Sequence, residues 1–171
     1  MKSATMADSD AALKIELNEK GHLLATWRHV MMQLYTAEAR RTTIVKASEM
    51  MRRLTRDNPA GIGSLVLVQH TGRPPDEGCR SAWVTQMREN QSKGILILFE
   101  GTSLRASIVR GVVTGMAQLA KRSADIHVSA KPREGLPWLV STLEQRGAPC
   151  GSVAEISAAV EEARRVVKSG D

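Results

Sequence analysis

Hydrophobic and polar residues alternate with a period of two near the start of the chain. The segment Ala12–Leu17 (ALKIEL) alternates in this way, and HLLATWR resumes the alternation after the short polar turn NEKG. Such alternation is typical of strands with one buried face, and two strands joined by a short turn form a hairpin. The sequence therefore predicts a leading β-hairpin, preceded by a small, polar and mobile segment over residues 1–10.

The pattern changes further along the chain to apolar runs that alternate with helical segments. The runs at 64–68 and 94–99 are continuous and rich in valine, leucine and isoleucine, which is typical of strands covered on both faces. A first long helix is expected after Thr36 as its N-cap and before the breaker DNPAG. Apolar residues recur at helical spacing in four later segments and predict helices over 76–90, 103–122, 133–147 and 152–168. A last short strand is predicted over 125–130.

This order of elements predicts the fold class. Strands that alternate with helices form a mainly parallel sheet, because each helical crossover returns the chain in the same direction. We therefore expect an α/β domain over residues 11–150, with a mainly parallel central sheet and a leading hairpin. The helix in residues 151–171 is additional to that unit, and three roles are open for it: covering the sheet, mediating dimerisation, or detaching.

Composition narrows the class of protein. The chain has 171 residues, and none of its apolar runs approaches the roughly 18 residues that a membrane span needs. Its two cysteines, Cys79 and Cys150, are too few for a disulfide framework, so both are expected as free thiols. The first residues lack the layout of a secretory signal, and a cytoplasmic location is the default expectation.

The net charge of +6 comes mainly from arginines, which are densest in the first predicted helix, ARRTTIVKASEMMRRLTR. Such a cluster is compatible with nucleic acid or with an acidic partner. Glu38 and Glu49 interrupt the run, however, and stacking aromatic residues are scarce, since the chain has three Trp, one Tyr and one Phe. A solvated basic face is therefore favoured, and nucleic acid is not expected as a partner.

Three segments carry a resemblance to a known family: TGRPPDEGCRSAWV, GILILFEGTSLRASIVRGVVTGM and PREGLPWL. Together with the order of elements, they resemble STAS-like domains, the fold of the anti-sigma-factor antagonists. The resemblance implies a domain that binds other proteins. It also implies a phosphoacceptor in the turn after the third strand, where Thr71 precedes Gly72. The chain departs from the family pattern at Gln69 and His70, which replace the acidic residue and the first of the paired serines.

A second turn is expected to meet the first at one edge of the sheet. Gly101, Thr102 and Ser103 follow a strand and precede a helix, so free backbone N–H groups and the positive end of the helix dipole would face this edge. Arg105 lies in the first turn of that helix, and the rigid Arg73–Pro75 segment lies at the same side. These features suit an anion or a carboxylate of a partner. A simple helix cap with Arg105 folded over the edge is favoured for the second turn, and a rigid surface loop explains Arg73–Pro75 equally well. The lysine and longer glycine loop of a nucleotide-binding turn are missing.

Two glycines inside the predicted helix over 103–122 need a reason, because each costs up to about 1 kcal/mol relative to alanine. Gly111 and Gly115 lie beside its apolar stripe, and Ser107 extends the strip of small residues. Such a strip allows close approach of another helix. That helix belongs either to this chain or to another subunit.

Catalytic and metal chemistry find little support. The four histidines, at 22, 29, 70 and 127, lie in separate elements without cysteine or carboxylate at ligand spacing. His70 and Cys79 form no recognisable nucleophile and base, because no third group is visible to orient them. We expect no catalytic residue, no metal and no cofactor.

The sequence therefore predicts a non-enzymatic regulatory or scaffolding module that binds another protein, with a homodimer as a further possibility. The alternative is a small-molecule or lipid-binding domain, in which some of the eight methionines line an adaptable pocket. Thr71 and Ser103 are the candidate phosphoacceptors. The predicted partner-binding residues are Thr71, Gly72, Arg73, Gly101, Thr102, Ser103, Arg105 and Arg110.

Overall fold

The computed structural model describes residues 12–69, 75–89, 91–100, 111, 114, 115, 118 and 125–169. The elements with defined bounds, in chain order, are β1 (Lys14–Glu19), β2 (His22–Trp27), β3 (Val30–Tyr35), α1 (Arg41–Asp57), β4 (Ile62–Gln69), α2 (Glu77–Glu89), β5 (Ser92–Glu100), β6 (Asp125–Ser129), α4 (Pro132–Gln145) and α5 (Val153–Ser169). Of the helix predicted over 103–122, the structure describes residues 111, 114, 115 and 118, which are helical.

The six strands form one sheet in the order β1-β2-β3-β4-β5-β6. β1 pairs with β2 and β2 with β3 in antiparallel fashion, whereas β3, β4, β5 and β6 are parallel neighbours. The predicted α/β class, the leading hairpin and the two buried strands are confirmed. The sheet is mixed, and its parallel part begins at β3.

The structure corrects the prediction between residues 30 and 40. Val30–Tyr35 (VMMQLY) forms strand β3, which pairs with Trp27 and its neighbours through a second hairpin. Helix α1 consequently begins at Arg41 rather than after Thr36, and its N-cap is Arg40, whose side chain forms no capping hydrogen bond. Every residue of β3 is buried, so its sequence has no polar face that would mark it as a strand.

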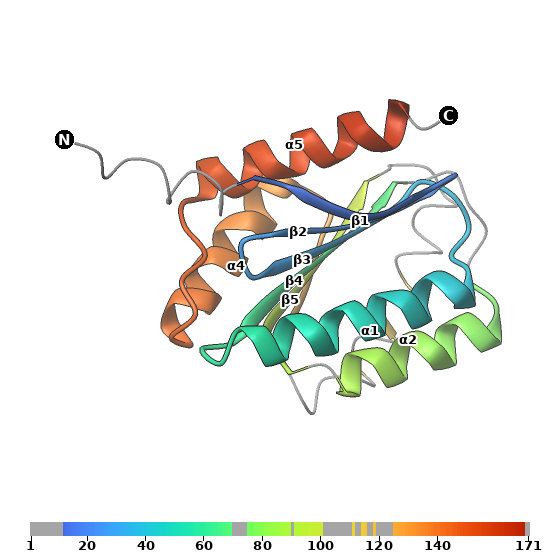
Figure 1. Ribbon diagram of the computed structural model, residues 1–171, viewed down its shortest axis with the longest axis horizontal. Coiled ribbons are helices and arrows are strands. Elements are labelled where there is room, and N and C mark those ends of the chain that lie inside the picture. Colours follow the sequence, from blue (N-terminus) through green and yellow to red (C-terminus); the bar gives the residue numbers. More distant parts are fainter. Residues whose placement is uncertain are drawn as a thin grey trace.

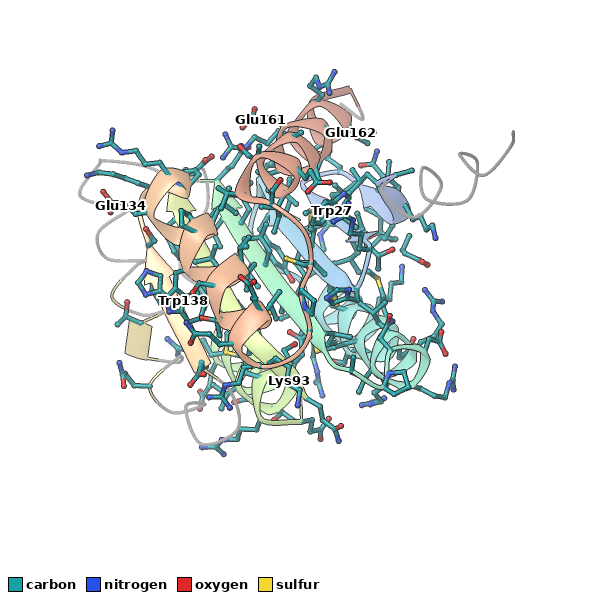
Figure 2. The ribbon with its side chains drawn as sticks, turned by 90° about the vertical axis from the view of Figure 1, so that its left-hand side faces the viewer. Trp27, Lys93, Glu134, Trp138, Glu161 and Glu162 are labelled. Atoms are coloured by element: carbon teal, nitrogen blue, oxygen red, sulfur yellow. The ribbon has the colours of Figure 1, made fainter. Side chains whose placement is uncertain are left out.

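Helices cover both faces of the sheet (Figure 1). α1 and α2 lie on one face, where Ile44 and Trp83 pack on Val66 and Ile97 of the central strands. α4 and α5 lie on the other face, over an apolar cluster that draws from β2 to β5. Successive residues of the buried strands point alternately into these two clusters, as the pleat requires. Trp27 of β2 lies beneath α5 (Figure 2).

Buried apolar side chains and a capping box hold α5 against the sheet. Ile156, Val160 and Ala163 on its inner side are buried in the same cluster as Trp27. Its N-terminus forms a capping box: the Ser152 N–H donates to Glu155 Oε2 at 2.7 Å, while the Glu155 N–H donates back to the Ser152 hydroxyl at 3.3 Å. Of the three roles considered for this helix, covering the sheet is the one observed.

Candidate functional site

The carboxyl ends of β4 and β5 lie side by side. Gln69 and Glu100 are register partners in the parallel pairing, and the Gln69 amide donates to Glu100 Oε2 at 3.2 Å. These are the last described residues before the two predicted site turns. The chain therefore enters both turns from neighbouring points at one edge of the sheet, and the approach of the turns themselves stays a prediction.

Most predicted site residues follow these two points and lie outside the described residues. They are Thr71, Gly72, Arg73, Gly101, Thr102, Ser103, Arg105, Ser107 and Arg110. Pro75, at the end of the first turn, is half-buried and leads into α2. The strand before Thr71 is the fourth and not the third, because β3 precedes it.

An arginine from α5 reaches this edge, which the sequence did not predict. The Arg164 guanidinium forms an ion pair with Glu100 and a second one, at 3.2 Å, with Glu161 one turn earlier on α5. The side chains of Arg164 and Glu100 are 18% and 24% exposed, so the pair is shielded from much of the solvent. Glu161 lies on the outer side of α5 (Figure 2). We call Gln69, Glu100 and Arg164 the edge triad.

The N-termini of α1 and α2 lie at the same end of the sheet and enclose a buried thiol. Cys79 is 4% exposed, and its Sγ donates to the Ala39 carbonyl at 3.3 Å. Burial and the neighbouring Asp76 carboxylate raise the pKa of the Cys79 thiol. A thiol with a raised pKa is protonated at neutral pH and is a poor nucleophile. His70, the partner considered for Cys79, lies outside the described residues.

A phenol and an imidazole are buried nearby. The Tyr35 hydroxyl donates to Gln33 Oε1 at 3.0 Å, and burial raises the pKa of Tyr35 above its ordinary value. His22 stacks edge-on against Tyr35, with ring centroids 5.4 Å apart, and its Nε2 lies 2.9 Å from the Glu38 carbonyl. Burial lowers the pKa of His22. These groups are held in their neutral forms, which suits a structural role.

The other described histidines lie apart. His29 Nε2 is 3.0 Å from the Ala148 carbonyl, and the His127 ring stacks on Trp138 with centroids 5.0 Å apart. Within the described part of the chain, no group of three His, Cys, Asp or Glu side chains is placed to hold a metal ion.

The basic residues of α1 face carboxylates from other elements. Lys46 pairs with Glu19 at 2.8 Å, and Arg53 pairs with Glu16 at 2.7 Å. Both acids lie on β1, which is an outer strand of the sheet. The remaining pairs are Arg52 with Glu89 and Arg56 with Asp57. These four cations are paired and largely exposed, and sequence spacing alone could not show the pairing because most of the acids come from β1 and α2.

The glycines of the predicted small-residue strip face open space. A Cβ atom added to Gly111 or Gly115 would meet no other atom within 4 Å. Within the part of the chain that the structure describes, no other helix docks on these two glycines, and docking of a helix from another molecule stays a prediction.

The buried methionines belong to the packed core. Met32, Met87 and Met31 each fall in a different apolar cluster, and Met50 and Met51 of α1 share the cluster of Met31. Of these five, Met51 lines a surface depression, between α1 and α2. The tryptophans Trp27 and Trp83 are core residues, and Trp138 packs at the edge of the core.

A polar depression of about 530 Å³ lies at the opposite end of the sheet. Its lining mixes cations with carboxylates, and Arg53 and Glu16 pair with each other within it. Because the charges of both signs are interspersed, the depression indicates no ligand class.

None of the family models, curated proteins or solved structures compared with this chain matches it. Among the described helices, none is both long enough and apolar enough to cross a membrane.

Proposed function

We propose that this chain is a non-enzymatic regulatory or scaffolding module, of STAS-like fold and acting in the cytoplasm, that binds another protein. The proposed binding surface comprises residues 71–73 and 101–105 together with Arg110, and we call it the rim. The observation that supports it best is the pairing of Gln69 with Glu100, since both turns start from these neighbouring residues. Ligand contacts in open α/β folds concentrate at this end of the strands.

Charge indicates the kind of partner surface. Glu100, the carboxylate at the start of the second turn, is already paired with Arg164. The sequence adds Arg73, Arg105 and Arg110 in the two following segments. Because the nearest acid is neutralised within the chain, the rim is expected to carry net positive charge and to attract acidic groups of a partner.

Phosphorylation would change this surface directly. A phosphate on Thr71 or Ser103 adds about 1.5 to 2 negative charges to a rim that we expect to be positive. We therefore propose these two residues as switch positions. Thr71→Glu and Ser103→Glu variants should weaken the capture of an acidic partner.

The test is site-specific photocrosslinking in cells of the source organism. A photoreactive amino acid replaces Arg73, Arg105 or, as a control, Arg146, which is exposed just after α4 at the opposite end of the sheet. If the rim binds a partner, positions 73 and 105 should crosslink to the same protein and position 146 should not.

The affinity of charge-reversal variants for the purified partner is then measured, to separate an effect of charge from an effect on folding. Arg105→Glu should weaken binding by about tenfold or more, which corresponds to about 1.4 kcal/mol, while Arg146→Glu leaves it unchanged. Different crosslinked proteins from positions 73 and 105, or equal binding by the wild type and Arg105→Glu, would show that the rim is not the binding surface.

A further inference from the structure

A groove runs between α1 and α2 on the side of the molecule away from the sheet. Two depressions, of about 530 Å³ and 220 Å³, share four lining residues and so form one continuous trench. The shared residues are Ser48, Arg52, Gln86 and Glu89. Along α1 the trench extends from Arg41 to Arg56, which at 1.5 Å per residue is roughly 22 Å.

The floor of this groove is apolar and one of its side chains is unusually exposed. Ile44 and Met51 are buried at the floor, whereas Val45 beside them is 47% exposed. Val45 is one of three large aliphatic residues with such exposure in the described part of the chain. An exposed apolar side chain within a concave surface marks a place where a partner can bury it.

The wall formed by α2 consists of small side chains. Gly78, Ser81, Ala82 and Thr85 line the groove, and their spacing places them on one side of α2. Small residues let the backbone of an incoming element approach closely. The Gln86 amide, which donates to the Ile44 carbonyl at 3.2 Å, fixes the two walls relative to each other.

The charges along the groove are mainly positive. Its described lining residues include Arg41, Arg52 and Arg56 and one acid, Glu89, while Arg56 also pairs with its neighbour Asp57. Glu89 lies 3.4 Å from Arg52 across the trench, and both side chains are more than half exposed. Exposed pairs of this kind contribute little, so Arg52 can exchange Glu89 for a carboxylate of a partner.

The occupant that fits these walls is helical. A groove between two helices offers few free backbone groups, so an extended peptide would leave its own N–H and C=O groups unpaired on the side facing the floor. A helix satisfies these groups internally and presents apolar side chains at i, i+3, i+4 and i+7. A trench of roughly 22 Å accommodates about 15 helical residues, or four turns.

We propose that the α1–α2 groove binds an acidic amphipathic helix of a partner protein, with an apolar residue over Val45 and carboxylates against Arg41, Arg52 and Arg56. The described residues that line the groove are different from those of the rim, so the proposal adds a second contact and a partner chemistry to the proposed function. Peptide binding at the groove does not depend on binding at the rim.

The test uses a fluorescent amphipathic peptide of about 15 residues, with leucines at i, i+3, i+4 and i+7 and glutamates on its flanks, in an anisotropy titration with the full chain. Val45→Glu should weaken binding by about tenfold or more. The matched control is Ile15→Glu, because Ile15 on β1 is equally exposed, at 46%, and lies outside the groove. This variant should bind as the wild type does.

A third variant removes a negative charge from the groove and should strengthen peptide binding. Glu89→Gln removes the competing carboxylate and should strengthen binding of the glutamate peptide, while a peptide with lysines in place of its glutamates should not bind. Arg105→Glu should leave peptide binding unchanged, which separates the groove from the rim.

Several outcomes would overturn the proposal. They are absence of peptide binding, equal binding by the wild type and Val45→Glu, and equal binding of the glutamate and lysine peptides. Binding to vesicles of phosphatidylserine and phosphatidylcholine that requires Val45, in place of peptide binding, would assign the groove to a membrane surface and would also overturn it.

Discussion

Arg28 donates to Glu155 Oε1 at 2.7 Å, although 127 positions separate the two residues in sequence. Arg28 lies in the tight turn between β2 and β3 with a φ of 52°, a left-handed conformation that is costly for a residue with a side chain. Its guanidinium also donates to the Cys150 carbonyl at 2.7 Å and lies 4.7 Å from the Trp27 ring centroid. One side chain therefore joins the β2–β3 turn to the start of α5.

This arrangement predicts acid sensitivity at Glu155. Hydrogen bonds from Ser152 and from Arg28 lower the pKa of Glu155 to about 2, from an ordinary 4.5. The unfolded chain then binds the proton more readily than the folded one, so the stabilisation by this carboxylate is fully present above pH 4.5 and is lost as the pH falls towards 2. The stability difference between the wild type and Glu155→Gln should shrink over this window, as measured by urea unfolding.

Glu162 provides the control for that measurement, because it is exposed on the same helix. Glu162→Gln should show no comparable loss of its stability difference between pH 4.5 and pH 2. If the curves of the wild type and Glu155→Gln stay parallel through this range, the capping box and the Arg28 contact do not hold α5 in the way described.

A pair of glycines tests the packing of α4. A Cβ added to Gly135 would lie 2.8 Å and 2.9 Å from methyl carbons of Leu96 and Leu98, which are fully buried and have no room to move aside. Gly135→Ala should therefore lower the free energy of unfolding by about 1–3 kcal/mol, although alanine is the better helix former. Gly115→Ala, where a Cβ meets open space, should instead raise it by up to about 1 kcal/mol. A stabilised Gly135→Ala variant would contradict the close contact of α4 with β5.

The sequence predicted those elements in which the residue types and the hydrophobic period indicate the same secondary structure. β4 and β5 are continuous runs of aliphatic residues, and a run of this kind has few interpretations other than a buried strand. β3 was missed although it is equally buried, because its two methionines and Gln33 lack the aliphatic signature and no alternation remains when both faces are covered. The late start of α1 follows from the same omission.

Of the candidate site, the sequence predicted the neighbouring strand ends from which the two turns start, and the charges beside them were not predicted. Parallel strands that are adjacent in the sheet end side by side, and the pairing of Gln69 with Glu100 shows this for β4 and β5. The role of Arg164 was not accessible, because 64 residues separate it from Glu100 and its local sequence is that of an ordinary solvated helix face. Long-range ion pairs leave no periodic signal.

His22 predicts a second pH effect, near neutrality. Burial lowers the pKa of His22 from an ordinary 6.5. Hydrogen bonds to the backbone of Glu38 and Lys20 oppose this shift without cancelling it, and the positive charge of Arg40 adds to the lowering. Below pH 6.5 the unfolded chain therefore binds a proton that the folded chain excludes, and stability falls with the pH. His22→Gln keeps a donor for the Glu38 carbonyl without a titratable group. It should lose less stability than the wild type between pH 7.5 and pH 5, and an identical loss would contradict burial of His22.

The edge triad predicts an energetic coupling between Arg164 and Glu100. Arg164→Leu removes the cation that faces the shielded Glu100 carboxylate and should lower the free energy of unfolding by about 1–3 kcal/mol. Glu100→Gln removes the charge on the other side, so the double variant should be less destabilised than the sum of the two single variants, with a coupling energy of about 0.5 kcal/mol or more. The exposed pair Lys131–Glu134, at 3.1 Å, is the control, and its own cycle through Lys131→Met and Glu134→Gln should give less than about 0.5 kcal/mol. Equal coupling in the two cycles would mean that α5 does not shield the carboxyl end of β5, and the argument that Glu100 is neutralised at the rim would fail with it.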